Sequence, residues 1–262
     1  MNTGSNLRFC FELDALEDIQ PWGEAEKHTL HWFGLTSGRY WMSTPLGEAL
    51  RYTEERESLW NLTSPYVDYQ IARWFEDLQC VLPFAMEPVP SDIANMVTYC
   101  ERDERLIQWL EAGRQSNGKL DVWSGASQWW NDRNIDTAYL VNGPEFHFWR
   151  IGDQVFIRWE QKTDEKDVWE LPNGQFATDA AVFQAAINGF LDEVISRMKQ
   201  RVDTIRTKGW RRTDCSLDIE GLVREQEQRT GWVREVKERQ AKTDWASTRG
   251  FLGRLQSGLR QT

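Results

Sequence analysis

The clearest strand signal in the sequence is the stretch EFHFWRIGDQVFIRWEQ, residues 145–161, which holds two alternating runs separated by a Gly-Asp pair. Alternation of apolar and polar residues is typical of a half-buried strand, and a Gly-Asp pair is typical of a hairpin turn. The alternation places Phe146 and Phe148 on one face of the first strand and His147 and Trp149 on the other. The stretch therefore predicts an antiparallel hairpin with aromatic rings on both faces.

Three other stretches predict further strands. LRFCFEL, residues 7–13, alternates in the same way. LHWFGLTSGRYW, residues 30–41, reads as a second hairpin in which TSG forms the turn, and we expect Trp32 and Trp41 to pair across the strands for about 0.2–1 kcal/mol. These rings are then sheet and core, although a surface platform for a ligand is the alternative. A last strand is expected in 168–178, with a turn at its Asn-Gly pair.

Apolar residues at three- and four-residue steps predict the helices. The longest covers about 179–207, with Thr178 as N-cap and Gly209 at its end, and it would be roughly 40 Å long. GRQSNGKLDVWSG, residues 113–125, is interpreted as a loop. The other predicted helices are 66–82, 91–99 starting at Ser91, 103–113, 216–240 with a Glu225/Arg229 pair, and a short tail helix capped by Thr243 or Asp244.

These elements predict an α+β fold, because the strands fall in separated groups without a βαβ rhythm. The expected architecture is an antiparallel sheet of hairpins packed against several helices, with a long helix near 179–207 and a helical C-terminus. No internal repeat and no low-complexity linker divides the chain. Residues 1–262 are therefore predicted to form a single α+β domain, with a helical C-terminal extension at about 211–262.

Charge is distributed unevenly along the chain, whose formal net charge is −10. The first 196 residues hold 15 Lys and Arg against 32 Asp and Glu, whereas the remainder holds 16 against 9. An acidic body repels the phosphates of nucleic acids and favours a cationic partner. Plain solubility is the alternative explanation for this charge.

The lack of long apolar runs and the spacing of the cysteines indicate a cytoplasmic protein without a membrane segment. The sequence contains no run of about 18 apolar residues and no apolar stretch of signal-peptide length at its start. Its four cysteines lack C-x-x-C spacing, so we interpret them as ordinary thiols rather than a metal or redox site. They are Cys10, Cys80, Cys100 and Cys215.

No motif specifies a reaction or a cofactor. The sequence has no G-x-S-x-G, no phosphate-binding loop and no dinucleotide fingerprint, so no catalytic or cofactor-binding residue is assigned. His28 and His31 form the only paired-histidine spacing, but a strand would place their rings on opposite faces. We expect a solvated His28, a packed or hydrogen-bonded His31, and no metal ion.

Two groups of residues are candidates for binding a partner. In VWSGASQWWNDRNID, residues 122–136, tryptophans lie near acidic residues, which suits a sugar, a cation or, if the rings are exposed, a protein partner. The alternative is that two of these rings fill a gap beneath the 145–161 hairpin. A run of glutamates forms a second acidic patch, although such runs are usually only solvated. The candidates are Trp123, Trp129, Trp130, Asp132 and Asp136 in the first group and Glu54, Glu55 and Glu57 in the second.

The order of several motifs resembles an uncharacterised bacterial protein family over nearly the whole chain. Its signature consists of tryptophans that build the fold, so it indicates the family and assigns no catalytic residue. Families of this kind are often encoded beside secreted polymorphic toxins, and the resemblance therefore implies an immunity role. The motifs are FCFELDALEDIQPWG, LHWFGLTSGRYW, YVDYQIARWFEDLQCVLPFAMEPVP, WWNDRNIDTAYLVNGPEFHFWRIGDQVFIRW and REQEQR followed by TDWASTRGFL.

Three hypotheses of function follow. The first is a cytoplasmic immunity protein that binds a cognate, cationic toxin or effector domain and neutralises it by occlusion. The second is an enzyme whose acidic, aromatic-lined cleft acts on a sugar or other small molecule. The third is a regulatory or scaffolding module whose basic C-terminal helices bind an acidic partner. An enzyme should show a hollow with convergent carboxylates, whereas an inhibitor should show an acidic surface that is flat or protruding.

Overall fold

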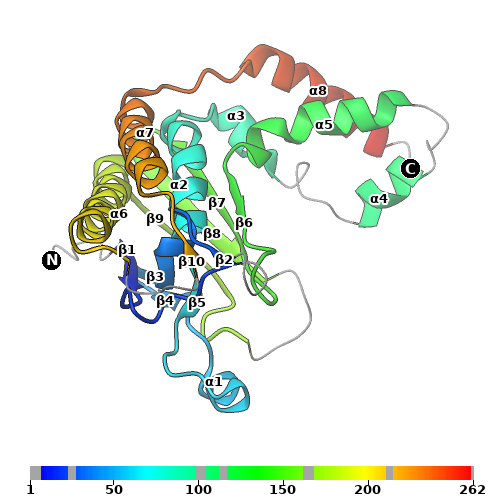
Figure 1. The fold of residues 1–262 in the computed structure, drawn as a ribbon. Helices are drawn as coiled ribbons and strands as arrows, with labels where there is room; N and C mark the ends of the chain where they lie inside the picture. Colours follow the sequence, from blue (N-terminus) through cyan, green and yellow to red (C-terminus); the bar gives the residue numbers. More distant parts are fainter. Residues whose placement is uncertain are drawn as a thin grey trace, which may run out of the picture.

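The computed structural model describes residues 7–22, 28–97, 104–111, 117–161, 168–210 and 215–260. In this part of the chain, two four-stranded antiparallel sheets lie beside a layer of helices, and further helices extend to one side (Figure 1). The α+β class, the long helix and the helical C-terminus are therefore confirmed.

The predicted hairpin at 145–161 forms the centre of one sheet. Its strands are β7 (Glu145–Ile151) and β8 (Gln154–Glu160), flanked by β6 (Asn134–Asp136) and β9 (Asn173–Asp179) in the order β6-β7-β8-β9. Phe148 lies opposite Ile157. The expected turn at the Asn-Gly pair is wrong, because Asn173 and Gly174 begin β9 and pair with β8. A side chain at Gly174 would overlap the buried Trp159 ring, 2.1 Å away, so close packing requires this glycine.

The other sheet is built around β3 (Ser37–Thr44), which has β1 (Arg8–Leu13) on one edge and β4 (Gly47–Ala49) and β5 (Val67–Gln70) on the other. The predicted strand at 7–13 is thereby confirmed. β3 alternates as expected, burying Tyr40 and Met42 on one face. A short parallel pair joins β2 (His28–Thr29) to β10 (Cys215–Ser216).

The hairpin predicted at 30–41 is wrong. A 3-10 turn, η1 (Gly34–Thr36), precedes β3, so Trp32 does not lie opposite Trp41. Trp32 is buried against Phe75 and donates its indole N–H to Gln226 at 2.8 Å, whereas Trp41 stacks on Tyr66 at 3.9 Å. A buried indole needs a hydrogen-bond acceptor, and a residue 194 positions away supplies it.

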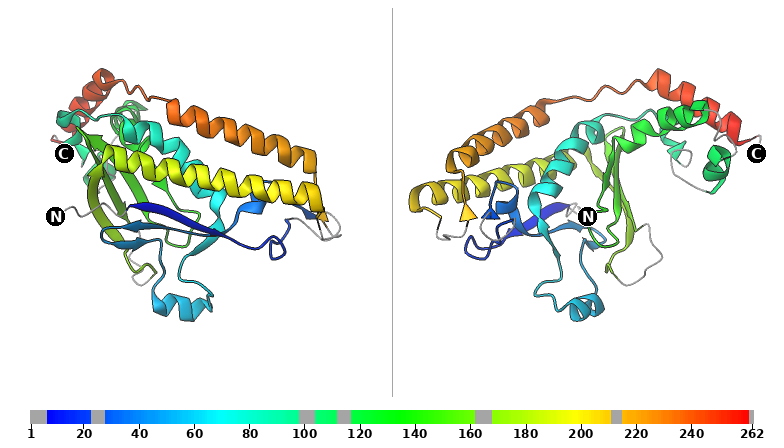
Figure 2. Two further views of the ribbon diagram at one scale, coloured as in Figure 1. Left: turned by 90° about the vertical axis from the view of Figure 1, so that its left-hand side faces the viewer. Right: turned by 45° about the vertical axis from the view of Figure 1, so that its right-hand side comes forward.

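Three long helices cover the sheets. α2 (Ile71–Met86) and α6 (Ala180–Lys208) pack against the strands, and α7 (Ile219–Glu238) lies along α6 on the outside (Figure 2). The long predicted helix is confirmed, including its end at Gly209, but its N-cap is Asp179 instead of Thr178. α2 begins later than predicted because residues 67–70 pair with β3 as β5.

Four more helices form a helical lobe: α3 (Ser91–Ala94), α4 (Glu104–Glu111), α5 (Asn117–Asn131) and α8 (Trp245–Leu259). The loop expected at 113–125 is wrong from residue 117 onward, because α5 packs along α8. Gly125 permits this contact, since the ring of Phe251 lies where a side chain would be. The tail helix is confirmed with Asp244 as its cap. α3 ends before the predicted boundary, and residues 98–99, 103 and 112–113 of the predicted helices lie outside the described residues.

The described residues contain two hydrophobic cores. The main core lies between the sheets and α2, α6 and α7 and includes Trp74 and Phe146. The second core lies between the helices of the lobe and the outer face of β7, where Trp149 contacts Trp130 at 5.2 Å. The helices of the predicted C-terminal extension are therefore divided between the two cores. α7 contributes Val233 to the main core, and α8 contributes to the second core.

A buried ion pair joins the lobe to the main core. Arg133, after α5, donates to Glu87 at 2.7 Å and to the carbonyl oxygen of Trp129 at 2.7 Å. Glu87, after α2, also accepts from the backbone N–H of Thr243 at 2.8 Å, just before α8. One carboxylate thus holds together the ends of three helices, and removal of either charge would leave the other without its counter-charge.

Candidate functional site

The tryptophans predicted to contact a partner lie mainly in the second core. Trp129 is 0% exposed and Trp130 is 2% exposed. The Trp130 ring stacks on His147 of β7 at 4.0 Å, and Trp123 is half-buried at the edge of the same core. This burial favours the interpretation that Trp129 and Trp130 fill space against the hairpin.

The two aspartates of this segment make local contacts. Asp132 is half-buried and accepts a hydrogen bond from Gln128 at 2.7 Å. Asp136 is exposed at the end of β6 and accepts from the backbone N–H of Ala138 at 3.0 Å. Of the five predicted contact residues in this segment, Asp136 is exposed, Trp123 and Asp132 are half-buried, and Trp129 and Trp130 are buried.

The second predicted group lies on a short helix, α1 (Glu54–Trp60), which extends away from the body between β4 and β5 (Figure 1). We call residues 53–64 the α1 projection. Its first turn contains Glu54, Glu55 and Glu57, and the helix buries none of its residues. Carboxylates in a first turn interact favourably with the helix dipole, so this charge also stabilises α1.

The α1 projection is held firmly at both ends. Thr53 caps the helix by accepting from the backbone N–H of Arg56 at 3.2 Å, and Asn61 ends it in a left-handed conformation with φ 52°. At its base, Tyr52 stacks on Trp169 at 4.6 Å and meets Trp60 edge-on at 5.5 Å. The projection therefore presents a defined shape.

An exposed leucine accompanies these glutamates. Leu59 is 70% exposed, and Trp60 beside it is half-buried under the guanidinium of Arg56, whose carbon is 4.8 Å from the ring centre. A single exposed leucine is common on protein surfaces. On the α1 projection, however, Leu59 lies one helical turn after Glu55, so an apolar and an acidic side chain share one face of the helix.

A hydrogen-bonded carboxyl group that sequence reasoning missed lies on α2. The hydroxyl of Tyr139 donates to Asp77 at 3.1 Å, and the Tyr139 ring stacks on Tyr69 at 5.2 Å. Burial raises the pKa of Asp77 to about 6, although Tyr139 and Arg73 act in the opposite direction. Asp77 is therefore a group that changes charge near neutral pH, and no motif in the sequence marks it.

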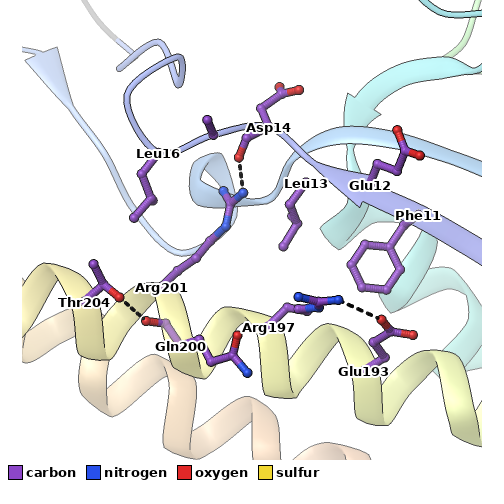
Figure 3. Close-up of a pocket in the computed structure, with 11 residues that line it drawn as sticks. Phe11, Glu12, Leu13, Asp14, Leu16, Glu193, Arg197, Gln200, Arg201 and Thr204 are labelled. Carbon is purple, nitrogen blue, oxygen red and sulfur yellow. Dashed lines mark hydrogen bonds and ion pairs between the residues drawn. The ribbon is translucent and has the colours of Figure 1, made fainter.

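A hollow of about 480 Å³ opens between β1 and α6 (Figure 3). We call it the β1–α6 hollow; residues 11–16 form one wall and α6 forms the other between residues 193 and 204. The carboxylates of Glu12 and Asp14 lie on the side of the strand that faces away from α6, and Glu193 pairs with Arg197 at 3.6 Å (Figure 3). None of the tryptophans lines this hollow.

No metal site is found among the residues that the structure describes, because no three His, Cys, Asp or Glu side chains there are placed to hold an ion. His31 is exposed and its ring contacts Trp22 at 4.7 Å. Cys10 and Cys80 are free thiols, and burial raises the pKa of each; Cys100 lies outside the described residues.

Within the described residues, no helix combines the length and apolarity needed to cross a bilayer.

Comparisons with known proteins identify the family alone. No curated protein and no solved structure matches the chain. The model of a protein family described as "Family of unknown function (DUF5984)" matches residues 8–250. This match covers every motif quoted from the sequence except the last two residues of the final one, and the chain therefore belongs to this family.

Proposed function

We propose that the protein binds another protein through the α1 projection and neutralises it by occlusion, the partner being a cognate toxin or effector domain with a cationic surface. The observation that carries this proposal is that α1 buries none of its residues and yet is anchored at both ends. An isolated helix of seven residues is unstable in water. The fold therefore maintains a protruding helix that has no fully buried residue and whose last residue, Trp60, packs against the edge of the main core.

Charge and rigidity both favour association at this element. Glu54 and Glu55 are exposed and Glu57 is half-exposed, so the projection extends the negative charge of the first 196 residues into solvent. Such charge steers a cationic partner and raises the association rate, roughly 10- to 1,000-fold at low salt. Because the projection is already ordered, binding would cost little conformational entropy.

The other two hypotheses receive less support. A catalytic cleft would need convergent carboxylates, but those of Glu12 and Asp14 lie on the far side of the strand from the β1–α6 hollow. A basic docking surface on the C-terminal helices would need unneutralised cations. Part of this positive charge is already neutralised, because Lys237 pairs with Asp192 at 2.5 Å and Arg249 pairs with Asp92 at 2.6 Å. The toxin itself is suggested by the family resemblance alone.

Co-expression with the products of adjacent genes tests the proposal. Growth rescue and co-purification with one of them are expected for the wild-type chain. Reversal of charge in the variant E54K/E55K/E57K should abolish rescue and slow association by at least about tenfold. The matched control E227K/E235K/E238K makes the same charge change on exposed positions of α7 and should retain rescue.

Two results would contradict the proposal. One is full rescue by the α1 variant when circular dichroism shows it to be folded like the wild type. The other is that no adjacent product is toxic or binds the wild-type chain.

Added salt should weaken association of the wild type, because exposed charges are screened within about 8 Å at physiological ionic strength.

A further inference from the structure

The two walls of the β1–α6 hollow differ in chemistry. Phe11, Leu13 and Leu16 make one wall largely apolar, because the carboxylates that alternate with them point away from α6 (Figure 3). The α6 wall contains Arg197 and Arg201 together with Glu193, Gln200 and Thr204. An apolar surface thus faces two guanidinium groups in a protein whose first 196 residues are strongly acidic.

Arg201 is a half-buried cation that has backbone partners in place of a carboxylate. Its guanidinium donates to the carbonyl oxygen of Leu35 at 2.6 Å and to that of Asp14. The Asp14 carboxylate is engaged elsewhere, since it accepts from Ser37 at 2.8 Å and pairs with Arg39 at 3.7 Å. Burial lowers the pKa of Arg201 to about 10, which reflects a charge removed from water without full compensation.

Further donors are present at the hollow. A guanidinium has five N–H groups in a fork that matches a carboxylate, and the two carbonyl contacts of Arg201 leave others available. Arg197 is exposed and pairs with Glu193 on its own helix at 3.6 Å. An exposed pair of this kind is worth at most about 1 kcal/mol, so Arg197 is easily recruited by another anion.

We propose that the β1–α6 hollow binds an organic anion that combines a carboxylate with an apolar group. The carboxylate would pair with Arg201 and Arg197, and the apolar group would pack on Phe11 and Leu13. A volume of about 480 Å³ falls within the usual range for small-molecule sites, roughly 300–1,000 Å³. This site is independent of the α1 projection, so the two proposals can fail separately.

A carboxylate combined with an apolar group occurs both in a free organic acid and at the C-terminus of a peptide that ends in an apolar residue. Calorimetric titration of the full chain with two probe pairs distinguishes them. The first pair is 4-phenylbutyrate and its amide. The second is a pentapeptide ending in leucine, prepared with a free carboxylate and with a C-terminal amide. Tighter binding of one acid than the other identifies the source.

A variant that adds charge to the hollow tests the position of the site. Arg201 also ties α6 to β1, so its replacement could disturb folding; Q200E instead changes an exposed side chain in the α6 wall with no change of size. Repulsion should weaken the carboxylate probe at least about tenfold. Q228E makes the same change at an exposed position of α7 and should leave affinity unchanged.

The expected result is one-to-one binding of at least one acid, at least about tenfold tighter than its amide, with the stated responses of the two variants. Equal affinity for acid and amide would overturn the proposal, because the guanidinium groups would then play no part. Failure of both acids to bind at millimolar concentration would overturn it as well. An equal loss of affinity in Q200E and Q228E would place the binding elsewhere.

Discussion

The main core and the second core use the same kinds of residue on very different scales. Among the described residues, 40 buried apolar side chains form the main core and ten form the second. Trp74 in the main core is enclosed by rings from both sheets, including Tyr40 and Phe146. Trp130 in the second core lies on α5 and makes its ring contacts with one strand, β7, and with its chain neighbour Trp129. Since stability rises with buried apolar area, the main core should dominate the free energy of unfolding.

This difference indicates that the helical lobe depends on the body. Its ten-residue core is small for an independent domain. The lobe gains the outer face of β7 and the Arg133–Glu87 ion pair from the body, whereas the main core takes nothing from α5 or α8. We therefore expect the lobe to open without unfolding the sheets, as sub-global units of low stability do.

The largest effect should come from replacing one tryptophan in each core. Trp74→Ala should lower the global free energy of unfolding by about 3–5 kcal/mol, because it leaves a cavity between the sheets. Trp130→Ala removes the same side chain from the lobe, where the loss is limited by the lobe's own stability. Urea denaturation measures the global change, and hydrogen exchange of α5 and α8 measures the local one.

The comparison would be refuted by equal global losses in the two variants. It would also be refuted if Trp130→Ala exposed amides of β8 and β9 as much as those of α8. Either result would mean that the two cores unfold as one cooperative unit.

An intermediate effect is expected from two glycines inside helices. At Gly125 of α5 an added methyl group would lie 2.6 Å from the Phe251 ring, so Gly125→Ala should destabilise the lobe by about 1–3 kcal/mol. At Gly189 of α6 nothing lies within 4 Å. Gly189→Ala is the matched control and should stabilise the body by roughly 0.5–1 kcal/mol, because alanine favours a helix. Hydrogen exchange should show a lower stability of the lobe in Gly125→Ala and a higher stability of the body in Gly189→Ala. A stabilised lobe in Gly125→Ala would contradict the observed helix contact.

An effect smaller than that of Gly125→Ala concerns pH and also separates the two regions. Because the folded-state pKa of Asp77 is raised to about 6, its contribution to stability is present below about pH 4 and is lost as pH rises toward 6. The effect is on the order of 1–2 kcal/mol, and Asp77→Asn should remove it. In the lobe the pKa of Asp92 is lowered by Arg249 and that of Asp244 by Ser247, so their contribution is lost only as pH falls below about 4.

Unfolding and hydrogen exchange followed between pH 3 and 7 test this prediction. We expect the body to gain stability from pH 6 to 4 and the lobe to lose stability below pH 4. A body whose stability does not change between pH 4 and 6, or an unchanged dependence in Asp77→Asn, would show that Asp77 does not titrate in this window.

Local patterns predicted the elements whose neighbours are close in sequence. The hairpin at 145–161 needed only alternation and a turn, and α6 needed only a repeated apolar stripe and a terminal glycine. Residues 30–41 and 117–125 were misread for a different reason. Trp32 depends on Gln226, and α5 depends on α8, which follows it by more than 100 residues. Contacts of that range leave no periodic signal near the residues that make them.

The candidate sites show the same division. The sequence located the glutamates of α1, but only the structure showed that they lie on an anchored projection. Trp129 and Asp136 are close in sequence, yet one is buried and the other exposed. Asp77 and Arg201 carry no sequence signature, because burial and the position of their partners give them their properties.

Local spacing and composition were enough to establish the α+β class, the longer strands, the long helix and the acidic character of the body. Tertiary structure alone decided which rings fill the cores, how the C-terminal helices are shared between them, and which charged groups face solvent or a hollow. The physical reason is that burial is a property of the assembled chain: a side chain loses water only when distant segments close over it.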